Sequence, residues 1–362
     1  MMSQDSNSIS PFSSEHIVLS IDAMGGDLGP SVVINGMARF LNRNQNVRYI
    51  VHGDETKLKM LLEKRPDLEK CCDIRHSDAI VKMEDKPSHV MRHGKDTSMW
   101  SCIDAVRDKH AEVAVSCGNT GALMAVSMIR LRKAPGINRP AIAILWPSDN
   151  PQGSNVMLDV GADIRAEASD LLQYAMMGAS YARNGLDVAR PRIGLLNVGT
   201  EEHKGRIELK EAHERISEQA ENANFEFVGF VEGGDIPSDK VDVIVTDGFT
   251  GNVALKTAEG TATVVRKRLG QAFKQTPFAM LGALLAYGSL RRLSKKIDPR
   301  RSNGGVFLGL NGTVVKSHGG ADAKGIEAAI RLAYQLAQNG FTEKLAARVA
   351  SSTSPSNDTE KQ

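Results

Sequence analysis

The sequence predicts an α/β protein in which helices cover both faces of a mainly parallel sheet. Short apolar strands alternate with amphipathic helices along the chain, and strands such as Val243-Ile244-Val245 are apolar at successive positions. The length of 362 residues is enough for one large domain. We therefore expect a single catalytic domain over 16–350, between disordered tails at 1–15 and 351–362.

The alternation can be followed in chain order. Strands are expected at 16–21, 47–51, 73–76, 113–116, 141–145, 155–160, 193–197, 225–231, 241–246, 306–308 and 313–316. Helices are expected at 31–42, up to 64, at 98–108, after 119, and at 167–184, 206–222, 252–273 and 321–339. The charged stretch 78–97 breaks the pattern and is expected to be a long loop, either functional or disordered.

Charge and cysteine content exclude several classes of protein. The 45 basic and 43 acidic residues leave a net charge of +2, which gives no general affinity for nucleic acid. The four cysteines form no Cys-x-x-Cys pair, so neither a disulfide framework nor a zinc site is indicated. The polar start resembles no signal peptide, and no apolar run is long enough to span a bilayer. We expect a cytoplasmic protein without a cofactor or resident metal.

One glycine turn stands out, between the expected strand 113–116 and the following helix. In this turn Gly118 and Gly121 flank Asn119 and Thr120. Such a turn aims backbone N–H groups and the positive end of a helix at one point, which is how proteins hold phosphate. Asn119 or Thr120 could cap the helix or donate to the ligand. The alternative is an ordinary turn whose glycines serve only geometry.

Other strands end in similar small and polar residues. These strand-end residues are Asp22, Asp27, Ser116, Asp159, Asn197 and Asp247, with Lys204 and Asn252 shortly after two of them. Ligands of parallel sheets gather at the carboxyl ends of the strands, so we expect these residues near a common edge. Taken singly, each is more often a turn or helix cap.

Further motifs narrow the chemistry. Lys316 and His318 lie in a glycine-rich turn, where His318 is either a general base or a structural turn residue. A nucleophile elbow, a P-loop and a Gly-x-Gly-x-x-Gly fingerprint are all absent from the sequence. Metal ligation by Asp22, Asp27 and Asp159 remains open but has no histidine cluster to support it.

The most apolar run covers 278–287 and is flanked by cations on both sides. An apolar patch between cations suits the surface of an anionic bilayer, which Phe278, Leu281, Leu284 and Leu285 would contact. The alternative is a helix packed against the core or against a dimer partner. The run is too short to cross a membrane.

Five motifs together resemble one family, the bacterial phosphate acyltransferases of phospholipid synthesis (acyl-ACP:phosphate acyltransferases). They are Ile21-Asp22-Ala23-Met24-Gly25-Gly26-Asp27, Gly118-Asn119-Thr120-Gly121-Ala122, Leu158-Asp159-Val160-Gly161, Asp247-Gly248-Phe249-Thr250-Gly251-Asn252, and Leu310-Asn311-Gly312 with Val315-Lys316-Ser317-His318-Gly319. The match runs in order from about 16 to 340. Cys117 departs from it, since a small residue without a thiol is more usual there.

The resemblance implies transfer of a fatty acyl group from acyl carrier protein to inorganic phosphate, giving acyl phosphate for a downstream glycerol-3-phosphate acyltransferase. It implies a homodimer of three-layer α/β/α build, similar to phosphotransacetylases and to isocitrate/isopropylmalate dehydrogenases. It also implies peripheral membrane contact through a helical tip at about 275–296, which favours the membrane interpretation of the apolar run.

On this basis each residue receives an expected role. Gly118, Asn119, Thr120 and Gly121 would hold phosphate, while Lys204, Asn252, Lys316 and His318 would act on phosphate, thioester or leaving thiol. Asp22, Asp27, Asp159, Asn197 and Asp247 would orient these donors, because free carboxylates repel phosphate. Arg92, Lys95, Arg291 and Arg292 would receive the acidic carrier protein. Two rival functions are an oxidative decarboxylase on the same fold and a non-catalytic membrane adaptor for the carrier.

Overall fold

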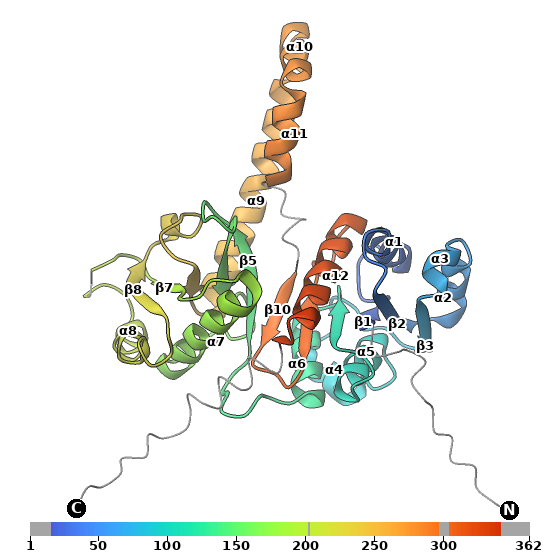
Figure 1. The fold of residues 1–362 in the computed structure, drawn as a ribbon, viewed down its shortest axis with the longest axis horizontal. Helices are drawn as coiled ribbons and strands as arrows, with labels where there is room; N and C mark the ends of the chain where they lie inside the picture. Colours follow the sequence, from blue (N-terminus) through green and yellow to red (C-terminus); the bar gives the residue numbers. More distant parts are fainter. Residues whose placement is uncertain (1–15, 202, 297–303, 342–362) are drawn as a thin grey trace, which may run out of the picture. The chain divides into compact units, whose positions relative to one another are not determined.

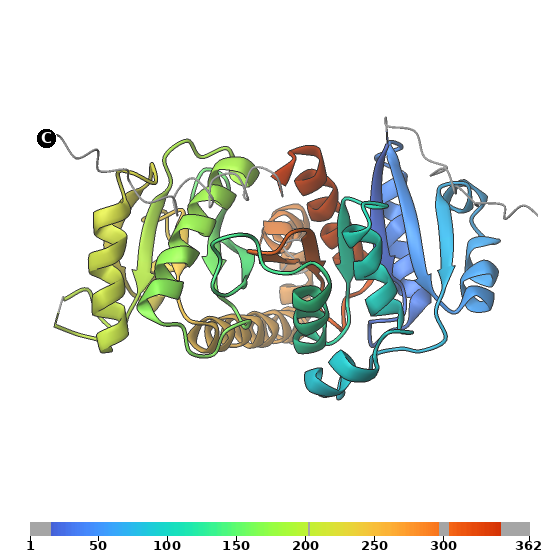
Figure 2. The same ribbon diagram turned by 90° about the horizontal axis from the view of Figure 1, so that it is seen from below.

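The computed structural model describes residues 16–201, 203–296 and 304–341, so the tails expected at 1–15 and 351–362 lie outside the described residues. The chain divides into two compact units, unit 1 (Met1–Leu131 and Gly312–Gln338) and unit 2 (Arg132–Asn311 and Asn339–Gln362). Each unit contains parallel strands flanked by helices, which confirms the predicted fold class (Figures 1 and 2). The single catalytic domain over 16–350 stays a prediction.

The strands of unit 1 are all parallel and follow the order β3-β2-β1-β4-β11. Their bounds are β1 Ile17–Asp22, β2 Val47–Gly53, β3 Cys72–His76, β4 Val113–Ser116 and β11 Thr313–Lys316. In β1, β4 and β11 most side chains are buried, as expected for strands covered on both faces. Asp22 and Lys316 are both register partners of Ser116, so three polar residues close three adjacent strands.

Helices follow most strands of unit 1. They are α1 Pro30–Leu41, α2 Glu55–Leu62, α3 Pro66–Glu69, α4 Pro87–His93, α5 Ser98–Arg107, α6 Thr120–Arg130 and α12 Ala323–Gln338. Helix α5 packs on β1, β2 and β4, whereas α12 packs on β1, β4, β11 and α1. The expected loop 78–97 is corrected in part because it contains α4, which begins at Pro87 and buries Val90.

The sheet of unit 2 mixes strand directions and follows the order β10-β5-β6-β9-β7-β8. Its strands are β5 Ala141–Pro147, β6 Ser154–Leu158, β7 Arg192–Leu196, β8 Glu226–Val231, β9 Val243–Val245 and β10 Gly305–Leu308. The pairs β10–β5 and β5–β6 are antiparallel, and the remaining pairs are parallel. The carboxyl ends of β6, β9 and β7 therefore lie at one edge of this sheet.

The helices of unit 2 are α7 Ala168–Leu186, α8 Ile207–Gln219, η1 Gly233–Asp235, α9 Gly248–Ala272, α10 Pro277–Leu285 and α11 Tyr287–Lys296. Only Gly248 and Gly251 are buried in the 25-residue α9, and no residue of α10 is buried. Within the described ranges, no helix is long and apolar enough to cross a bilayer.

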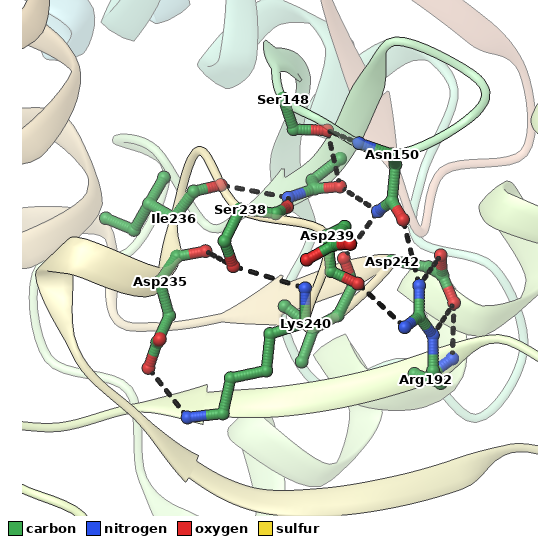
Figure 3. Close-up of polar contacts among 11 residues, drawn as sticks. Ser148, Asn150, Arg192, Asp235, Ile236, Ser238, Asp239, Lys240 and Asp242 are labelled. Atoms are coloured by element: carbon green, nitrogen blue, oxygen red, sulfur yellow. Dashed lines mark hydrogen bonds and ion pairs between the residues drawn. The ribbon is translucent and has the colours of Figure 1, made fainter.

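A polar network ties together the amino ends of β6, β7 and β9 in unit 2 (Figure 3). Arg192 donates to both carboxylate oxygens of buried Asp242, at 2.9 and 3.0 Å, and also donates to Asn150 Oδ1 at 2.9 Å. Asn150 and Asn155 are buried and hydrogen-bonded to each other. Because Asp242 pairs with Arg192, the pKa of that guanidinium is raised. The network lies at the strand ends opposite to the polar carboxyl ends.

Candidate active site

In unit 1, Asp22 is the centre of a hydrogen-bond network at the carboxyl ends of β1 and β4. Its carboxylate accepts from Ser98 Oγ at 2.7 Å and from Ser116 Oγ at 2.6 Å. Ser116 Oγ in turn accepts from the Gly118 N–H at 3.0 Å. Burial raises the pKa of Asp22, and the two serine donors partly offset this effect. Asp22 therefore holds the turn after β4 in place through Ser116, as an orienting residue would.

The turn after β4 has the predicted form of a strand, a glycine turn and a helix start. Asn119 is the N-cap of α6, because its Oδ1 accepts from the Ala122 N–H at 2.9 Å. Its Nδ2 donates to the carbonyls of Met83 at 2.5 Å and Asp85 at 3.3 Å. Both the oxygen and the nitrogen of the Asn119 side chain are therefore engaged, so Asn119 can offer a ligand only its backbone. Thr120 and Gly121 belong to the first turn of α6, whose N–H groups lack intrahelical acceptors.

Both glycines of this turn are closely packed. A Cβ on Gly118 would lie 2.5 Å from Met99 Cε, and one on Gly121 would lie 2.9 Å from Pro87 Cγ. A Cβ on Gly25 would lie 2.5 Å from Asp22 Oδ2 and 2.8 Å from the Gly118 nitrogen. Packing alone therefore favours a glycine at Gly121 and Gly25, where the Pro87 ring and the backbone are in the way, whereas at Gly118 the nearest atom is the end of the flexible Met99 side chain.

A buried cation lies beside the same turn. Lys316 Nζ donates to the carbonyl oxygens of Cys117, at 3.5 Å, and of Ser317. Lys316 also lowers the pKa of Asp22 electrostatically, although less than burial raises it. The structure thus brings a lysine, a carboxylate and a helix N-terminus together at the ends of three adjacent strands.

The turn after β11 carries His318, which is exposed. Its Nδ1 accepts from the Gly320 N–H at 3.2 Å, so a neutral ring carries its proton on Nε2. The Asp27 N–H donates to the Gly319 carbonyl at 2.9 Å, which joins the β1 and β11 turns. Among the described residues, no group of three or more His, Cys, Asp or Glu side chains is placed to hold a metal ion.

In unit 2, Asp159 organises the turn that follows β6. Its buried carboxylate accepts from the backbone N–H groups of Ile142 at 2.8 Å and Asp163 at 2.6 Å, and from those of Gly161 and Ala162. Burial raises the pKa of Asp159 to about 6, and the N–H donors act in the opposite direction. Both carboxylate oxygens of Asp159 accept hydrogen bonds from backbone N–H groups, so Asp159, like Asp22, has the contacts of an orienting residue.

Helix α9 begins after β9 and packs against this turn, because the Gly248 N–H donates to the Asp163 carbonyl at 2.7 Å. Asp247 caps α9, accepting from the Thr250 N–H at 2.8 Å, and it also pairs with Arg206. This cap explains why the helix starts at Gly248 and not at the expected residue 252. A Cβ on Gly248 would lie 2.5 Å from Asp159 Oδ2, and one on Gly251 would overlap the Asp159 carbonyl oxygen. The Asn252 side chain is exposed and lies over the Gly161 turn, 3.9 Å from a Cβ built there.

The loop after β7 holds Lys204. Asn197 is buried, and its side chain accepts from the Val198 N–H at 2.9 Å and donates to the Lys204 carbonyl at 3.2 Å. Lys204 Nζ is exposed and pairs with Glu201 at 2.7 Å, which raises the pKa of the lysine. Arg206 ties the end of this loop to the cap of α9. Lys204 and Asn252 therefore belong to neighbouring turns of the same unit.

The residues expected to meet a membrane or a carrier are exposed where they are described. Phe278, Leu281, Leu284 and Leu285 expose between 54% and 87% of their surface. Arg92, Lys95 and Arg292 are exposed, whereas the Arg291 side chain lies outside the described part of the chain. The four apolar residues do not pack against this chain's own core, so the interpretation of the apolar run 278–287 as a helix packed on the core is removed.

Sequence reasoning missed several supporting residues. Ser98 and Arg206 hold Asp22 and Asp247, yet each is far from its partner in the sequence. Arg139 pairs with Asp163 at 2.7 Å beside the Asp159 turn. No short motif marks these residues, because their roles depend on which elements the fold brings together.

The fold is shared with solved phosphotransacetylases. A phosphotransacetylase from Streptococcus pyogenes matches with a TM-score of 0.60 and 18% identity over 90% of this chain and 95% of that chain. The EutD phosphotransacetylase from Staphylococcus aureus matches with a TM-score of 0.56 and 15% identity over 90% and 95% of the two chains. At such low identity these neighbours define the class of fold.

Closer relatives define the family. A family model described as fatty acid synthesis protein matches residues 17–344. A phosphate acyltransferase of Jannaschia sp. is 71% identical over 92% of this chain and 91% of its own length. One of Paracoccus denitrificans is 64% identical over 97% of this chain and 96% of its own length. The chain therefore belongs to the phosphate acyltransferase family and is a transferase, which confirms the resemblance.

Proposed function

We propose that this phosphate acyltransferase takes a fatty acyl group from the thioester of acyl carrier protein and gives acyl phosphate for phosphatidic acid synthesis. The observation that carries the proposal is the arrangement at the ends of β1, β4 and β11. There a helix N-terminus, buried Lys316 and the Asp22–Ser116 pair surround one glycine turn. Such an arrangement suits a phosphate dianion.

Phosphate is itself the nucleophile in this scheme, so no covalent acyl-enzyme is needed. An oxygen of phosphate attacks the thioester carbonyl carbon, an oxyanion forms, and the C–S bond then breaks to release the carrier thiol, which takes up a proton. The buried thiol of Cys117 lies beside the turn, but burial raises its pKa to about 11. It therefore stays protonated near neutral pH and is a weak competitor of phosphate.

The turn Gly118, Asn119, Thr120 and Gly121 is proposed to bind phosphate through the backbone N–H groups of its last three residues, while the Gly118 N–H, which donates to Ser116 Oγ, fixes the turn. Asn252 is proposed to help hold phosphate, and Lys204 is proposed to offset phosphate charge or polarise the thioester carbonyl. Lys316 or His318 is proposed to assist the leaving thiol or orient phosphate. The positions of Asp22 and Asp159, whose oxygens are engaged by donors, support an orienting role and not a basic one.

The surroundings of the reaction are also proposals. Exposed Phe278, Leu281, Leu284 and Leu285 are proposed to place the enzyme on an anionic membrane surface. Arg92, Lys95, Arg291 and Arg292 are proposed to attract the carrier. A homodimer is supported by the near-complete exposure of α9, which carries apolar Val253, Val264, Val265 and Leu269 at its surface. A downstream glycerol-3-phosphate acyltransferase would use the product.

The deciding experiment incubates the enzyme with acyl carrier protein loaded with palmitate, with and without phosphate, and traps acyl phosphate with hydroxylamine. Phosphate-dependent hydroxamate formation with release of free carrier supports the proposal. Carrier binding without consumption would favour the adaptor, and NAD reduction by a hydroxy acid would favour the decarboxylase.

A further inference from the structure

The helices α1 and α12 of unit 1 carry a charge cluster that the proposed chemistry does not use. Glu327 of α12 is the only acidic residue within these two helices, and its side chain is 4% exposed. Three arginines converge on it: Arg39 of α1, Arg43 just after α1, and Arg331 of α12. We call these three residues the arginine cluster.

The arginine cluster contains more positive charge than Glu327 requires. Arg39 donates to Oε2 at 2.8 Å, while Arg43 and Arg331 both donate to Oε1, at 2.8 and 2.9 Å. Glu327 keeps a guanidinium donor on each oxygen when either Arg43 or Arg331 is removed. One carboxylate balances only one of the three guanidinium charges, so the cluster has two positive charges left over.

This surplus is local, since the whole chain is nearly balanced with 45 basic and 43 acidic residues. The arginine side chains expose 42%, 63% and 45% of their surface, so their remaining donors face solvent. Lys324 adds a further exposed cation one turn before Glu327. The outer face of α1 and α12 is thus cationic, with its one carboxylate buried.

The surroundings of this face favour a protein over a bilayer. Helices α1 and α12 lie side by side (Figure 1). A Cβ on Gly36 would lie 2.5 Å from Ile326 Cβ, and the rings of Phe40 and Tyr334 have their centroids 5.3 Å apart and are tilted by 57°. The cations therefore lie on two closely packed helices. The exposed neighbours are polar, such as Gln335 and Gln338, whereas a bilayer contact needs the apolar surface that α10 offers.

The face lies on the two helices that begin at the proposed chemistry. Helix α1 starts after the turn that holds Asp27, and α12 starts after the turn that holds His318. Arg39 and Arg331 follow these helix starts by nine and eight residues, which is about 12–14 Å along a helix. Arg43 follows the start of α1 by thirteen residues, so a partner bound to the cluster lies about 12–20 Å along the helices from the turns at the ends of β1 and β11.

We propose that the arginine cluster, with Lys324, is the docking surface for an acidic helix of the acyl donor protein. This inference rests on the proposed function, in which that donor is acyl carrier protein. Guanidinium groups match carboxylates in bidentate geometry, and a cationic patch accelerates encounter with an acidic partner.

The test uses the full-length enzyme and palmitoyl carrier protein at saturating phosphate. Arg43→Gln and Arg331→Gln each leave one guanidinium on each oxygen of Glu327, so the fold should be kept. Each should raise KM for the acyl carrier about 2- to 5-fold and leave kcat and the KM for phosphate unchanged. Arg43→Gln combined with Lys324→Gln should multiply the effects, and the salt dependence of KM should weaken.

Arg190→Gln is the matched control, because Arg190 is 52% exposed and pairs with an exposed glutamate in unit 2. Arg92→Gln with Lys95→Gln tests the other proposed carrier contact in parallel. Unchanged KM in both cluster variants would overturn the inference, as would loss of binding to anionic vesicles with an unchanged KM. Failure of the wild-type enzyme to use acyl carrier protein at all would instead refute the proposed function.

Discussion

Gly251 should be indispensable although glycine is a poor helix former. It lies in the first turn of α9, and a Cβ there would overlap the carbonyl oxygen of Asp159 and lie 3.1 Å from Thr246 Cγ2. The Asp159 oxygen belongs to the backbone and cannot rotate away. Gly260 lies in the same helix, and a Cβ there meets no atom within 4 Å. One substitution, glycine to alanine, should therefore have opposite effects at the two positions.

The magnitudes follow from two terms. Alanine is favoured over glycine inside a helix by about 1 kcal/mol, so Gly260→Ala should raise the free energy of unfolding by about that amount. At Gly251 the same gain is outweighed by overpacking, which costs about 1–3 kcal/mol or more when backbone must move. The gain is common to both positions, so the two variants should differ by the overpacking cost alone, about 1–3 kcal/mol or more. Asn252 follows Gly251 directly, so Gly251→Ala should also lower phosphate-dependent acyl transfer.

Urea unfolding followed by circular dichroism measures the difference, and hydroxamate trapping of acyl phosphate measures the transfer. If Gly251→Ala proves as stable as Gly260→Ala, the contact between α9 and the Asp159 turn is not as described. If Gly251→Ala is destabilised but fully active, the placement of α9 does not control Asn252.

Three further predictions concern the other proposed roles. Lys204→Ala and Asn252→Ala should each lower kcat about 10²-fold or more. The control is Lys240→Ala, which should keep kcat, because Lys240 is a comparably exposed lysine that pairs with Asp235. Near-normal turnover of Lys204→Ala and Asn252→Ala would refute the assignment. Replacing Leu284 and Leu285 by Glu should abolish co-sedimentation with anionic vesicles while sparing activity in solution, with exposed Met60→Glu of α2 as the control; unchanged co-sedimentation would exclude this membrane contact. Burial raises the pKa of Asp159 from 3.8 to about 6, so between these pH values the folded protein holds a proton that the unfolded chain has released. The contribution of Asp159 to the free energy of unfolding should therefore fall by up to about 3 kcal/mol as pH rises from about 4 to about 6. Asp159→Asn should remove this pH dependence in urea titrations. A contribution that rises over that pH range would contradict the prediction.

The local pattern of the sequence was enough to predict the class of fold and most elements. Apolar runs and cap residues depend on near neighbours, so strands such as Thr313–Lys316 were predicted at their observed bounds. The helix start at Asn119 follows from a local cap in the same way. The five motifs in order were enough to predict the family, because their combination is specific although each motif is common.

The tertiary structure decided which residues support the candidate site. Ser98 reaches Asp22 only because α5 packs on β1, and Arg206 reaches Asp247 only because the loop after β7 lies beside α9. The helix α4 inside the charged stretch, the occupied side chain of Asn119 and the convergence of three arginines on Glu327 also depend on packing. Partners far apart in sequence leave no periodic signal, since the fold alone fixes their distance.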